Sequence, residues 1–495
     1  MFKLSLWKAL VVLSIFCFAT AVAARAQTLT TLADFDGTNG DMPSIMTLIQ
    51  ATDGNFYGVT SAGGAYGMGT VFKVTAEGQL TTLHSFCAQT GCPDGRQPIA
   101  SLVQGTDGNL YGTTSFGGAN NDGTIFKITP EGQLTTLHVF NGTDGSAPSA
   151  LIQASNGNFY GGTFGGGNMA ACSNPGCGTI FELSAAGQFS TLHVFNGADG
   201  SAVNPLIQAS DGNFYGTTYY GGLNECAGYP GCGTVFKMNP GGSLTTLYTF
   251  HGADGWLPAG TLVQATNQNF YGTTDWGGTS NLGTVFEITP AGELKTLHSF
   301  DLTDGSMPGM GMVQATDGNL YGTTVGGGPN AVFMFGGGYG TIFEITSEGE
   351  FINVQNFDLT DGSFPWGGLV QATDGNFYGT TQNGGTFANC SIPAGCGTIF
   401  SFSTGLAPFV KLDPGSGDPG VAVTIRGTDV TGATKVTFNG KAAAFKVVSS
   451  TEMQATVPAE ATTGNVEITT PQHKLSSNVP FQVKRRVCCE HTVLR

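Results

Sequence analysis

The stretch TLTTLADF, residues 28–35, lies near the start of the chain and recurs as a set of related phrases further along. The six later copies are QLTTLHSF (79–86), QLTTLHVF (133–140), QFSTLHVF (188–195), SLTTLYTF (243–250), ELKTLHSF (293–300) and EFINVQNF (350–357). Each later copy ends a repeating unit, whereas TLTTLADF precedes the first unit. This placement raises the question of which unit the first copy completes.

Two further phrases define the repeating unit. The first contains a tyrosine, in the form GNFYG or a close variant, and a phrase like GTVFK follows it each time. The seven tyrosines are 49 to 57 residues apart: Tyr57, Tyr111, Tyr160, Tyr215, Tyr271, Tyr321 and Tyr378. A period of this length is typical of repeat architectures in which each unit is one supersecondary element.

Each unit contains four short runs that have the composition of β-strands. Runs such as LVQATDG, NFYGTT, GTVFKITP and LTTLHSF are rich in Val, Ile, Thr, Phe and Tyr, and Gly, Asp, Asn or Pro bound them. Four antiparallel strands in each of seven units predict an all-β fold, a seven-bladed β-propeller. A β-helix would have a shorter repeat, about 20 residues.

The seventh unit lacks its fourth run. It stops after GTIFSFS (397–403), and no copy of LTTLHSF follows. We therefore expect residues 28–35 to supply the missing strand and to close the ring, because an open ring would leave unpaired strand edges.

The repeat phrases resemble a known family. DGNFYGTT, GTVFK and LTTLHSF are similar to the GloVer tandem repeat of exported bacterial "choice-of-anchor" proteins, over residues 28–404. The resemblance implies an extracytoplasmic repeat protein of undefined biochemical role. Kelch repeats have a similar period and Gly-Gly doublets, but their Tyr and Trp pattern is not reproduced here.

The composition changes after residue 404. The phrases VTFNGKAAAF, ATVPAEATTGNVEITT and NVPFQV resemble an IPT/TIG immunoglobulin-like domain, which implies a small β-sandwich that acts as a spacer or packing module. The predicted organisation is a signal peptide over 1–26, the repeat region over 27–404, the IPT/TIG domain over 405–484 and a basic tail over 485–495.

The first 26 residues predict export. Lys3 and Lys8 precede the apolar run 9–24, and a small-x-small site predicts cleavage between Ala26 and Gln27. The alternative is a membrane anchor, but the run is short for a span of about 20 residues. We expect an extracellular or cell-surface protein with no transmembrane segment in the mature chain.

Close pairs of cysteines agree with that compartment. In an exported protein such pairs predict disulfides. The alternative is zinc, which would require two such pairs to converge and Cys-x2-Cys-like spacing, whereas the spacings here are wider. The adjacent Cys488 and Cys489 have no assigned role, and an intermolecular bridge is one option. The predicted disulfides are Cys87–Cys92, Cys172–Cys177, Cys226–Cys232 and Cys390–Cys396.

The charge is concentrated in the repeat region. Residues 27–404 carry 27 acidic and five basic residues, and the whole chain has a formal charge of −16. Such a surface repels nucleic acid and anionic membranes, although acidity can also serve solubility alone. Neutral or cationic partners stay open.

Aromatic residues in the long, variable loops are the candidate ligand-binding residues. These loops fall on one face of the predicted ring, and exposed indoles there suit stacking on sugars or apolar ligands. The alternative is that the rings only pack the bases of the loops. The candidates are Trp256, Trp276, Trp366, Tyr219, Tyr220 and Tyr229.

Histidine and aspartate patterns are weaker candidates. His84, His138, His193 and His298 share one position of the outer strand, so they cannot converge on one substrate. Asp301/Asp304 and Asp358/Asp361 in FDLTDGS could hold calcium, but Asp-Gly is an ordinary turn former and no closing Glu is present. No catalytic residue and no cofactor are predicted.

Three functions are compatible with this pattern. The first is an exported binding or cell-surface protein whose ligand is a glycan, a surface polymer or a protein. The second is a polysaccharide hydrolase or lyase on the same face, which rests on analogy of fold alone. The third is a purely structural component of the envelope.

Overall fold

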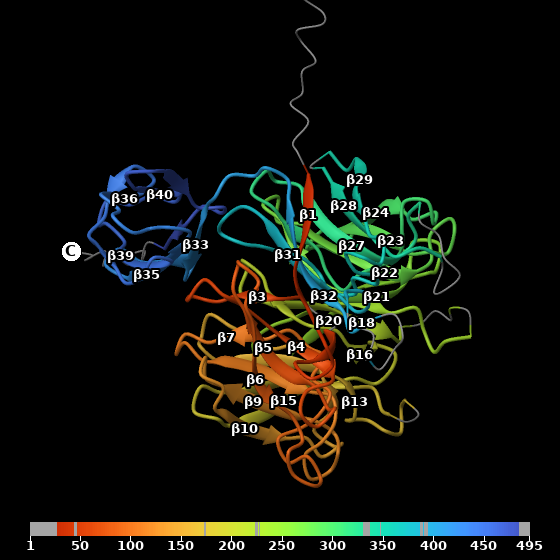
Figure 1. Ribbon diagram of the computed structural model, residues 1–495. Helices are drawn as coiled ribbons and strands as arrows, with labels where there is room; N and C mark the ends of the chain where they lie inside the picture. The colour runs from red at the N-terminus through yellow and green to blue at the C-terminus, as the bar shows by residue number, and fades with distance from the viewer. Residues whose placement is uncertain are drawn as a thin grey trace, which may run out of the picture.

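The computed structural model describes residues 27–43, 47–172, 175–222, 226, 228–329, 337–346, 348–386, 390 and 395–484. The described residues form strands, turns and loops, without a helix (Figure 1). Accordingly, the described part of the chain contains no helix with the length and apolarity needed to span a membrane. The predicted signal peptide and the tail with Cys488 and Cys489 lie outside the described residues.

The repeat region forms one antiparallel sheet for each repeat, here called sheets 1 to 7 in chain order. In every sheet the second, third and fourth strands of the repeat pair in sequence, and the first strand pairs with the second. Sheet 1 contains β2 (Asp41–Pro43), β3 (Ile49–Gln50), β4 (Phe56–Ala62), β5 (Thr70–Val74) and β6 (Leu80–Ser85). Sheet 2 contains β7 (Val103–Gln104), β8 (Leu110–Thr114), β9 (Thr124–Ile128) and β10 (Leu134–Val139).

Sheets 3 to 6 repeat this arrangement. Sheet 3 contains β11 (Ser146–Pro148), β12 (Ile152–Gln153), β13 (Phe159–Gly165), β14 (Thr179–Leu183) and β15 (Phe189–Val194). Sheet 4 contains β16 (Ser201–Val203), β17 (Ile207–Gln208), β18 (Phe214–Tyr220), β19 (Thr234–Met238) and β20 (Leu244–Thr249). Sheet 5 contains β21 (Trp256–Gln264), β22 (Phe270–Trp276), β23 (Thr284–Ile288) and β24 (Leu294–Ser299). Sheet 6 contains β25 (Ser306–Pro308), β26 (Val313–Gln314), β27 (Leu320–Gly326), β28 (Thr341–Ile345) and β29 (Phe351–Asn356).

Sheet 7 combines the two ends of the repeat region. It contains β30 (Val370–Gln371), β31 (Phe377–Thr381), β32 (Thr398–Ser403) and, beyond β32, the N-terminal strand β1 (Thr28–Asp34). The register runs antiparallel from Thr28 opposite Ser403 to Asp34 opposite Thr398. The first copy of the terminal phrase therefore pairs where the seventh repeat lacks its own fourth strand.

Each recurring phrase has a packing role. In sheet 4 the Tyr215 hydroxyl donates to the carboxylate of Asp211 in the preceding turn, at 2.9 Å. The hydroxyls of Thr218 and Thr234 form a buried pair at 2.8 Å between the second and third strands. Gly216 must lack a side chain because a Cβ there would lie 2.7 Å from the Phe236 ring. These contacts explain the recurrence of Tyr-Gly, Thr-Thr and Gly-Thr-x-Phe.

In four of the seven sheets a further short strand precedes the first run that the sequence pattern predicts. In sheet 1, for example, β2 and β3 pair with opposite ends of β4. Every repeat has a residue with positive φ at the corresponding position, a conformation that L-residues adopt at a cost of about 1–2 kcal/mol. These residues are Met42, Gln97, Ala147, Ala202, Leu257, Met307 and Phe364. In sheet 5 this residue lies within the continuous strand β21.

Neighbouring sheets are joined by three sets of contacts, and each set also connects sheet 7 to sheet 1. Buried apolar side chains of consecutive sheets form common clusters; Phe35 and Tyr378 of sheet 7 pack with Phe56 and Phe72 of sheet 1. The backbone N–H of each positive-φ residue donates to a carbonyl of the preceding sheet at 2.9–3.1 Å, from Met42 to Cys396 in the last pair.

Glutamines at the ends of the first strands form the third set. The Gln104 amide oxygen accepts from the backbone N–H of Thr52 at 2.9 Å, and Gln50 accepts in the same way from Thr373 at 3.0 Å. The other five bonds, at 2.8–3.1 Å, join Thr106 to Gln153, Ser155 to Gln208, Ser210 to Gln264, Thr266 to Gln314 and Thr316 to Gln371. These side chains therefore link each sheet to the next, and the bonds to Thr52, Thr316 and Thr373 are partly buried.

Residues 405–484, here called the C-terminal domain, form a separate β-structure with its own core. Val423, Ile425, Val436, Phe438 and Phe481 are fully buried in it. One sheet contains β33 (Val410–Asp413), β35 (Ala422–Gly427), β39 (Glu452–Thr456) and β38 (Phe445–Val447). A second contains β37 (Lys441–Ala442), β36 (Lys435–Phe438), β40 (Val466–Thr469) and β41 (Lys474–Ser476), and β34 (Ser416–Gly417) pairs with β42 (Gln482–Val483).

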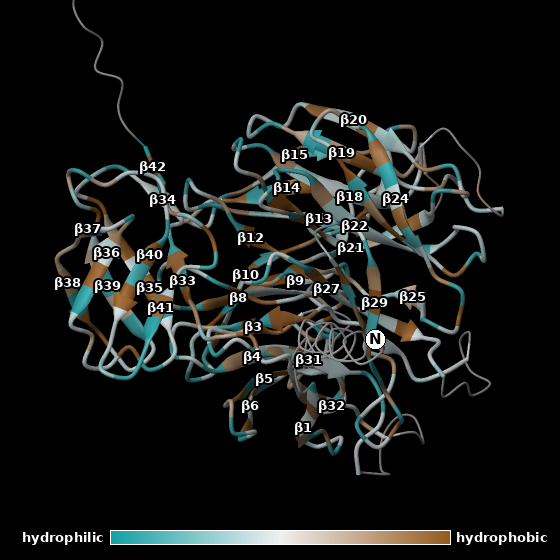
Figure 2. Cartoon of the chain, turned by 90° about the horizontal axis from the view of Figure 1, so that it is seen from above, coloured by the Kyte–Doolittle hydropathy of each residue, from teal (hydrophilic) through white to brown (hydrophobic). Residues whose placement is uncertain are grey.

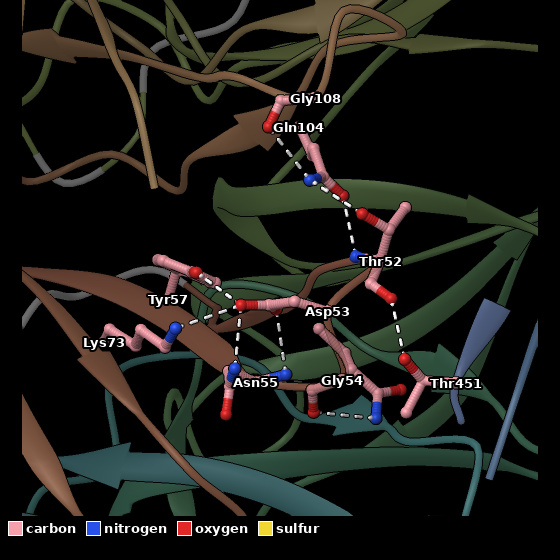
Figure 3. Close-up of polar contacts among 10 residues, drawn as sticks. Thr52, Asp53, Gly54, Asn55, Tyr57, Lys73, Gln104, Gly108 and Thr451 are labelled. Atoms are coloured by element: carbon pink, nitrogen blue, oxygen red, sulfur yellow. Dashed lines mark hydrogen bonds and ion pairs between the residues drawn. The ribbon is translucent and has the colours of Figure 1, made fainter. Parts of the chain in front are cut away.

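The C-terminal domain lies to one side of the repeat region (Figures 1 and 2). It contacts the face that carries the turns between first and second strands, here called the turn face. The Thr451 hydroxyl donates to the carbonyl of Thr52 at 2.9 Å, next to the turn in which Asp53 binds Tyr57 and Lys73 (Figure 3). The turn face consists of the turns 51–55, 105–109, 154–158, 209–213, 265–269, 315–319 and 372–376.

Candidate ligand-binding site on the link face

The opposite face of the repeat region, here called the link face, carries the long connections between second and third strands. The positive-φ residues and the Asp-Gly loops after the fourth strands lie at the same ends of the sheets. The C-terminal domain forms hydrogen bonds with Thr52, Gln371 and Thr373, which lie at the turn face. The link face is therefore where variable loops can meet a ligand.

Six aromatic side chains of sheets 3, 4 and 5 form one continuous group on this face, here called the aromatic cluster. Phe164 contacts both Tyr219 and Tyr220, with ring centroids 6.4 and 6.2 Å apart. From Tyr220 the contacts continue to Tyr229 at 5.8 Å and then to Trp256 at 5.3 Å. The last contact of the cluster joins Trp256 to Trp276 at 6.1 Å.

Strand pairing explains this convergence. Trp256 lies directly opposite Trp276 in sheet 5, and Ser201 lies opposite Tyr220 in sheet 4. Tyr229 is held in the adjoining loop, where its N–H donates to the carbonyl of Cys226 at 2.8 Å. The cluster is thus built on two strand ends and one disulfide-linked loop.

The members of the cluster differ in exposure. Tyr229 is 43% exposed and Phe164 is 41% exposed, whereas Trp256 is only 7% exposed. The Trp256 indole N–H donates to the Asn281 side-chain oxygen at 3.0 Å, so its polar atom is satisfied within the protein. Trp256 forms the base of the cluster, and Tyr229 and Phe164 offer ring surface to a ligand.

A buried carboxyl group lies beside these rings. Asp275 is 3% exposed, and its carboxylate accepts a hydrogen bond from the Tyr219 hydroxyl at 2.6 Å. Burial raises the pKa of Asp275 to about 7, and the hydrogen bond from Tyr219 opposes that shift. Burial also raises the pKa of Tyr219, which therefore stays protonated. The pair places a titratable oxygen next to an aromatic surface.

The structure brings together five of the six aromatic residues that the sequence suggests. Trp366 lies elsewhere, on the segment before β30, where its carbonyl accepts from the N–H of Met310 at 2.9 Å. Sequence reasoning missed Phe164 and Asp275. The signal was present, because Phe164, Tyr219 and Asp275 follow the same Gly-x-Thr phrase in three consecutive repeats.

The four predicted disulfides are confirmed. They join residues five or six positions apart: Cys87–Cys92, Cys172–Cys177, Cys226–Cys232 and Cys390–Cys396. Cys232 also accepts the Leu257 N–H through its carbonyl, so this disulfide lies at the junction of sheets 4 and 5. Gln27 is described as the residue before β1, while the Ala26 side of the predicted cleavage site lies outside the described residues.

The repeated histidines each belong to a different sheet and pair with an aspartate of an Asp-Gly loop. His138 binds Asp144 at 3.0 Å, and burial lowers the pKa of His138 although Asp144 opposes the shift. The equivalent pairs are His84–Asp94, His193–Asp199 and His298–Asp304, at 2.8–3.0 Å.

The proposed calcium ligands take part in turns. Asp301 accepts from the backbone N–H and hydroxyl of Thr303, and Asp304 accepts from the N–H of Asp301. Asp358 and Asp361 repeat this geometry. Within the described ranges no group of three or more His, Cys, Asp or Glu residues is placed to hold a metal. Calcium binding by these loops stays a prediction.

Comparison with solved structures shows an all-β likeness without close sequence similarity. A fungal alcohol oxidase of the AA5 family, solved in complex with copper, aligns over 92% of this chain and 99% of its own length, at 12% identity and a TM-score of 0.50. The extracellular domain of a putative hybrid two-component system from B. thetaiotaomicron aligns over 92% of this chain at 11% identity, with a TM-score of 0.47. This chain spans 58% of the length of that domain. The search of curated proteins finds no match.

Comparison with family models is more specific. The model of the Gloeobacter/Verrucomicrobia repeat matches three segments, residues 18–174, 167–392 and 227–436. The model of the IPT/TIG domain matches residues 409–483. These matches cover the repeat region and the C-terminal domain, so the chain belongs to the Gloeobacter/Verrucomicrobia repeat family and carries a C-terminal IPT/TIG domain.

Proposed function

We propose that this protein is an exported binding or cell-surface protein that recognises a glycan or surface polymer through its aromatic cluster. In this proposal the seven sheets are the blades of a propeller, and β1 completes the last blade. The hydrogen bonds and apolar contacts between sheet 7 and sheet 1 support the ring. A closed ring would give the link face the rigidity that a preorganised binding surface requires.

The observation that carries the ligand class is the composition of the aromatic cluster. Exposed tyrosine and phenylalanine rings stack on the apolar faces of sugars, and the adjoining tyrosine hydroxyls and Asp275 carboxyl can bind sugar hydroxyls. The excess of acidic over basic residues in the repeat region disfavours polyanionic polymers. A neutral or cationic polymer fits the surface best.

Export rests on two observations. The four disulfides are typical of proteins that mature outside the reducing cytoplasm. The N-terminal segment has the basic start, apolar run and small-x-small site of a signal peptide. Both observations support extracellular or cell-surface residence.

A second function, a polysaccharide-acting enzyme, is favoured by one observation. A buried carboxyl with a pKa near neutrality, hydrogen-bonded to a tyrosine at 2.6 Å, has the properties of a general acid or base. Turnover of a bound polymer that is lost in Asp275→Asn, with binding kept, would establish this function in place of simple binding.

A glycan and polysaccharide array tests the proposal. We expect the wild-type protein to bind at least one polymer, and the double variant Tyr229→Ala/Phe164→Ala to lose most of that binding, because both rings are exposed members of the cluster. Phe116→Ala is the matched control. Phe116 is 40% exposed at the repeat position of Trp276, but it stacks on Arg96 in sheet 2.

The outcomes separate the three functions. Binding that survives in the double variant, or that Phe116→Ala removes equally, would contradict a site at the aromatic cluster. An absence of binding by the wild-type protein would favour a protein partner or a structural role in the envelope.

A further inference from the structure

A cavity lies between the repeat region and the C-terminal domain, away from the aromatic cluster. Its volume is about 280 Å³, close to the lower end of the range of small-molecule sites. First strands or adjoining residues of sheets 1, 2, 5, 6 and 7 line it, and the C-terminal domain completes it through β33 and Asn478. The C-terminal domain therefore forms one wall of the cavity, through Phe409, Lys411 and Asn478.

The wall of this cavity is mainly apolar. Leu48, Leu369 and Phe409 are each 3% exposed, and Met312 is 7% exposed. Val263 adds a further aliphatic side chain from sheet 5. Apolar walls of this kind favour a ligand with a hydrocarbon body.

Lys411 is the only ionisable residue among the described residues that line the cavity. Its ammonium group donates to the carbonyl of Gln371 at 2.6 Å and lies 5.7 Å from the centre of the Phe409 ring. Desolvation is the main cause that lowers the pKa of Lys411 to about 8, and the positive charge of Arg426 adds to it. The negative charge of Asp374 opposes the shift. Asp374 does not line the cavity, and its carboxylate accepts hydrogen bonds from Tyr378 and Asn376.

We propose that this cavity binds a small monocarboxylate with an aliphatic body. The carboxylate lies against the Lys411 ammonium, and the hydrocarbon lies along the first strands. A single ammonium matches the one negative charge of a carboxylate. A phosphate fits less well, because the apolar wall, without an arginine among the described lining residues, would not compensate the free energy of removing it from water. Asn478 of the same domain also lines the cavity, and a side-chain amide can donate to a carboxylate oxygen.

Calorimetric titration of the full chain with sodium octanoate at pH 7 tests this site, with 1-octanol as the uncharged probe. We expect octanoate to bind, and Lys411→Met to weaken it about tenfold, because a charge-assisted hydrogen bond is lost. The affinity for octanol should stay the same in that variant. Lys441→Met is the matched control, since Lys441 lies in the same domain but is exposed and paired with Glu460.

A second variant probes the cavity from its other side. Thr261→Trp places a large ring among the lining residues of sheet 5 without touching Lys411, and we expect it to abolish binding of both probes. The proposal is overturned if the wild-type chain does not bind octanoate. It is also overturned if Lys411→Met and Lys441→Met bind octanoate equally, or if Thr261→Trp leaves binding intact. None of these outcomes depends on the aromatic cluster.

Discussion

At the scale of single residues, polar groups placed inside the repeats distinguish one repeat from the next. Asp275 occupies a position where other repeats have Ser61, Ser115, Phe164 and Tyr219. The substitution of a carboxyl at this one position, next to the tyrosine of the preceding sheet, creates a polar site that the repeat does not otherwise contain.

The elevated pKa of Asp275 predicts a pH-dependent stability. The folded state keeps a proton up to about pH 7, whereas the unfolded state releases it near the ordinary aspartate pKa of 3.8. The free energy of unfolding therefore falls as pH rises from about 4 to about 7 and is level above that range. We expect Asp275→Asn to remove this fall and to be more stable than wild type at pH 8, by up to about 4 kcal/mol.

Urea denaturation of both proteins at pH 4 and pH 8 measures this difference. Tyr219→Phe is the companion variant, because it removes the hydroxyl that lowers the Asp275 pKa and should move the upper end of the window to higher pH. An equal stability difference at both pH values would show that the carboxylate is not desolvated in the folded protein.

At the scale of strands and loops, the contacts between sheets depend on side chains that sequence patterns do not single out. Gln371 is 3% exposed; its amide oxygen accepts from the N–H of Thr316, and its amide nitrogen donates to the carbonyl of Gly375. Gln153 makes the same two kinds of bond to Thr106 and Gly157, but Thr106 lies in an exposed turn.

This pair predicts unequal costs for one substitution. Gln371→Met leaves a half-buried N–H and a buried carbonyl without partners, so we expect it to lower the free energy of unfolding by about 3 kcal/mol. Gln153→Met leaves groups that water can reach, and about 1 kcal/mol is expected. Equal losses in chemical denaturation would contradict the view that these glutamines fix the sheets through buried bonds.

Many of the strands and loops could be predicted from the sequence, and there are physical reasons why the others could not. The strands, the repeat period and the disulfides follow from composition and spacing, because tight turns and β-branched runs are local signals. The short strands before the first run were missed, since their positive-φ residues, such as Ala147, are held by backbone bonds to the preceding sheet. The partner of Tyr219 was missed because Asp275 lies 56 residues away in the next repeat, and a contact between sheets leaves no local signal in the sequence.

The disulfide beside the aromatic cluster gives a second prediction at this scale. Closing a loop of six residues stabilises a protein by about 2 kcal/mol, so Cys226→Ser/Cys232→Ser should lose that amount. The variant should also change the fluorescence of Trp256 and Trp276, because the loop holds Tyr229 5.3 Å from Trp256. Cys87→Ser/Cys92→Ser, whose loop lies in the connection between sheets 1 and 2, should lose similar stability and keep the native fluorescence. Identical spectra in both variants would contradict the supporting role of Cys226–Cys232.

At the scale of the whole molecule, the two faces of the repeat region have different partners. The turn face is fixed by short turns and receives the C-terminal domain at Thr52 and Thr373. The link face carries the aromatic cluster and the four disulfides: three lie in connections between second and third strands, and Cys87–Cys92 lies in the loop after β6. The chain thus presents its variable surface away from the domain that covers the other face.

The pairing of β1 with β32 predicts that the N-terminal strand is required for a stable repeat region. Without residues 28–35, β32 becomes a free edge, and sheet 7 loses Phe35, which is 1% exposed and packs edge-on against Phe72 at 5.1 Å. We expect a chain that begins at Asp36 to unfold at a much lower temperature, and the milder Phe35→Ala to cost about 3–5 kcal/mol.

The peptide TLTTLADF, added in trans, should raise the unfolding temperature of the shortened chain, because the ladder of hydrogen bonds along β32 is still available. A scrambled peptide of the same composition should have no effect, since its apolar residues would not match the alternation of buried and exposed positions beside β32. If the shortened chain unfolds at the wild-type temperature, or if both peptides act alike, β1 does not hold the two ends of the repeat region together.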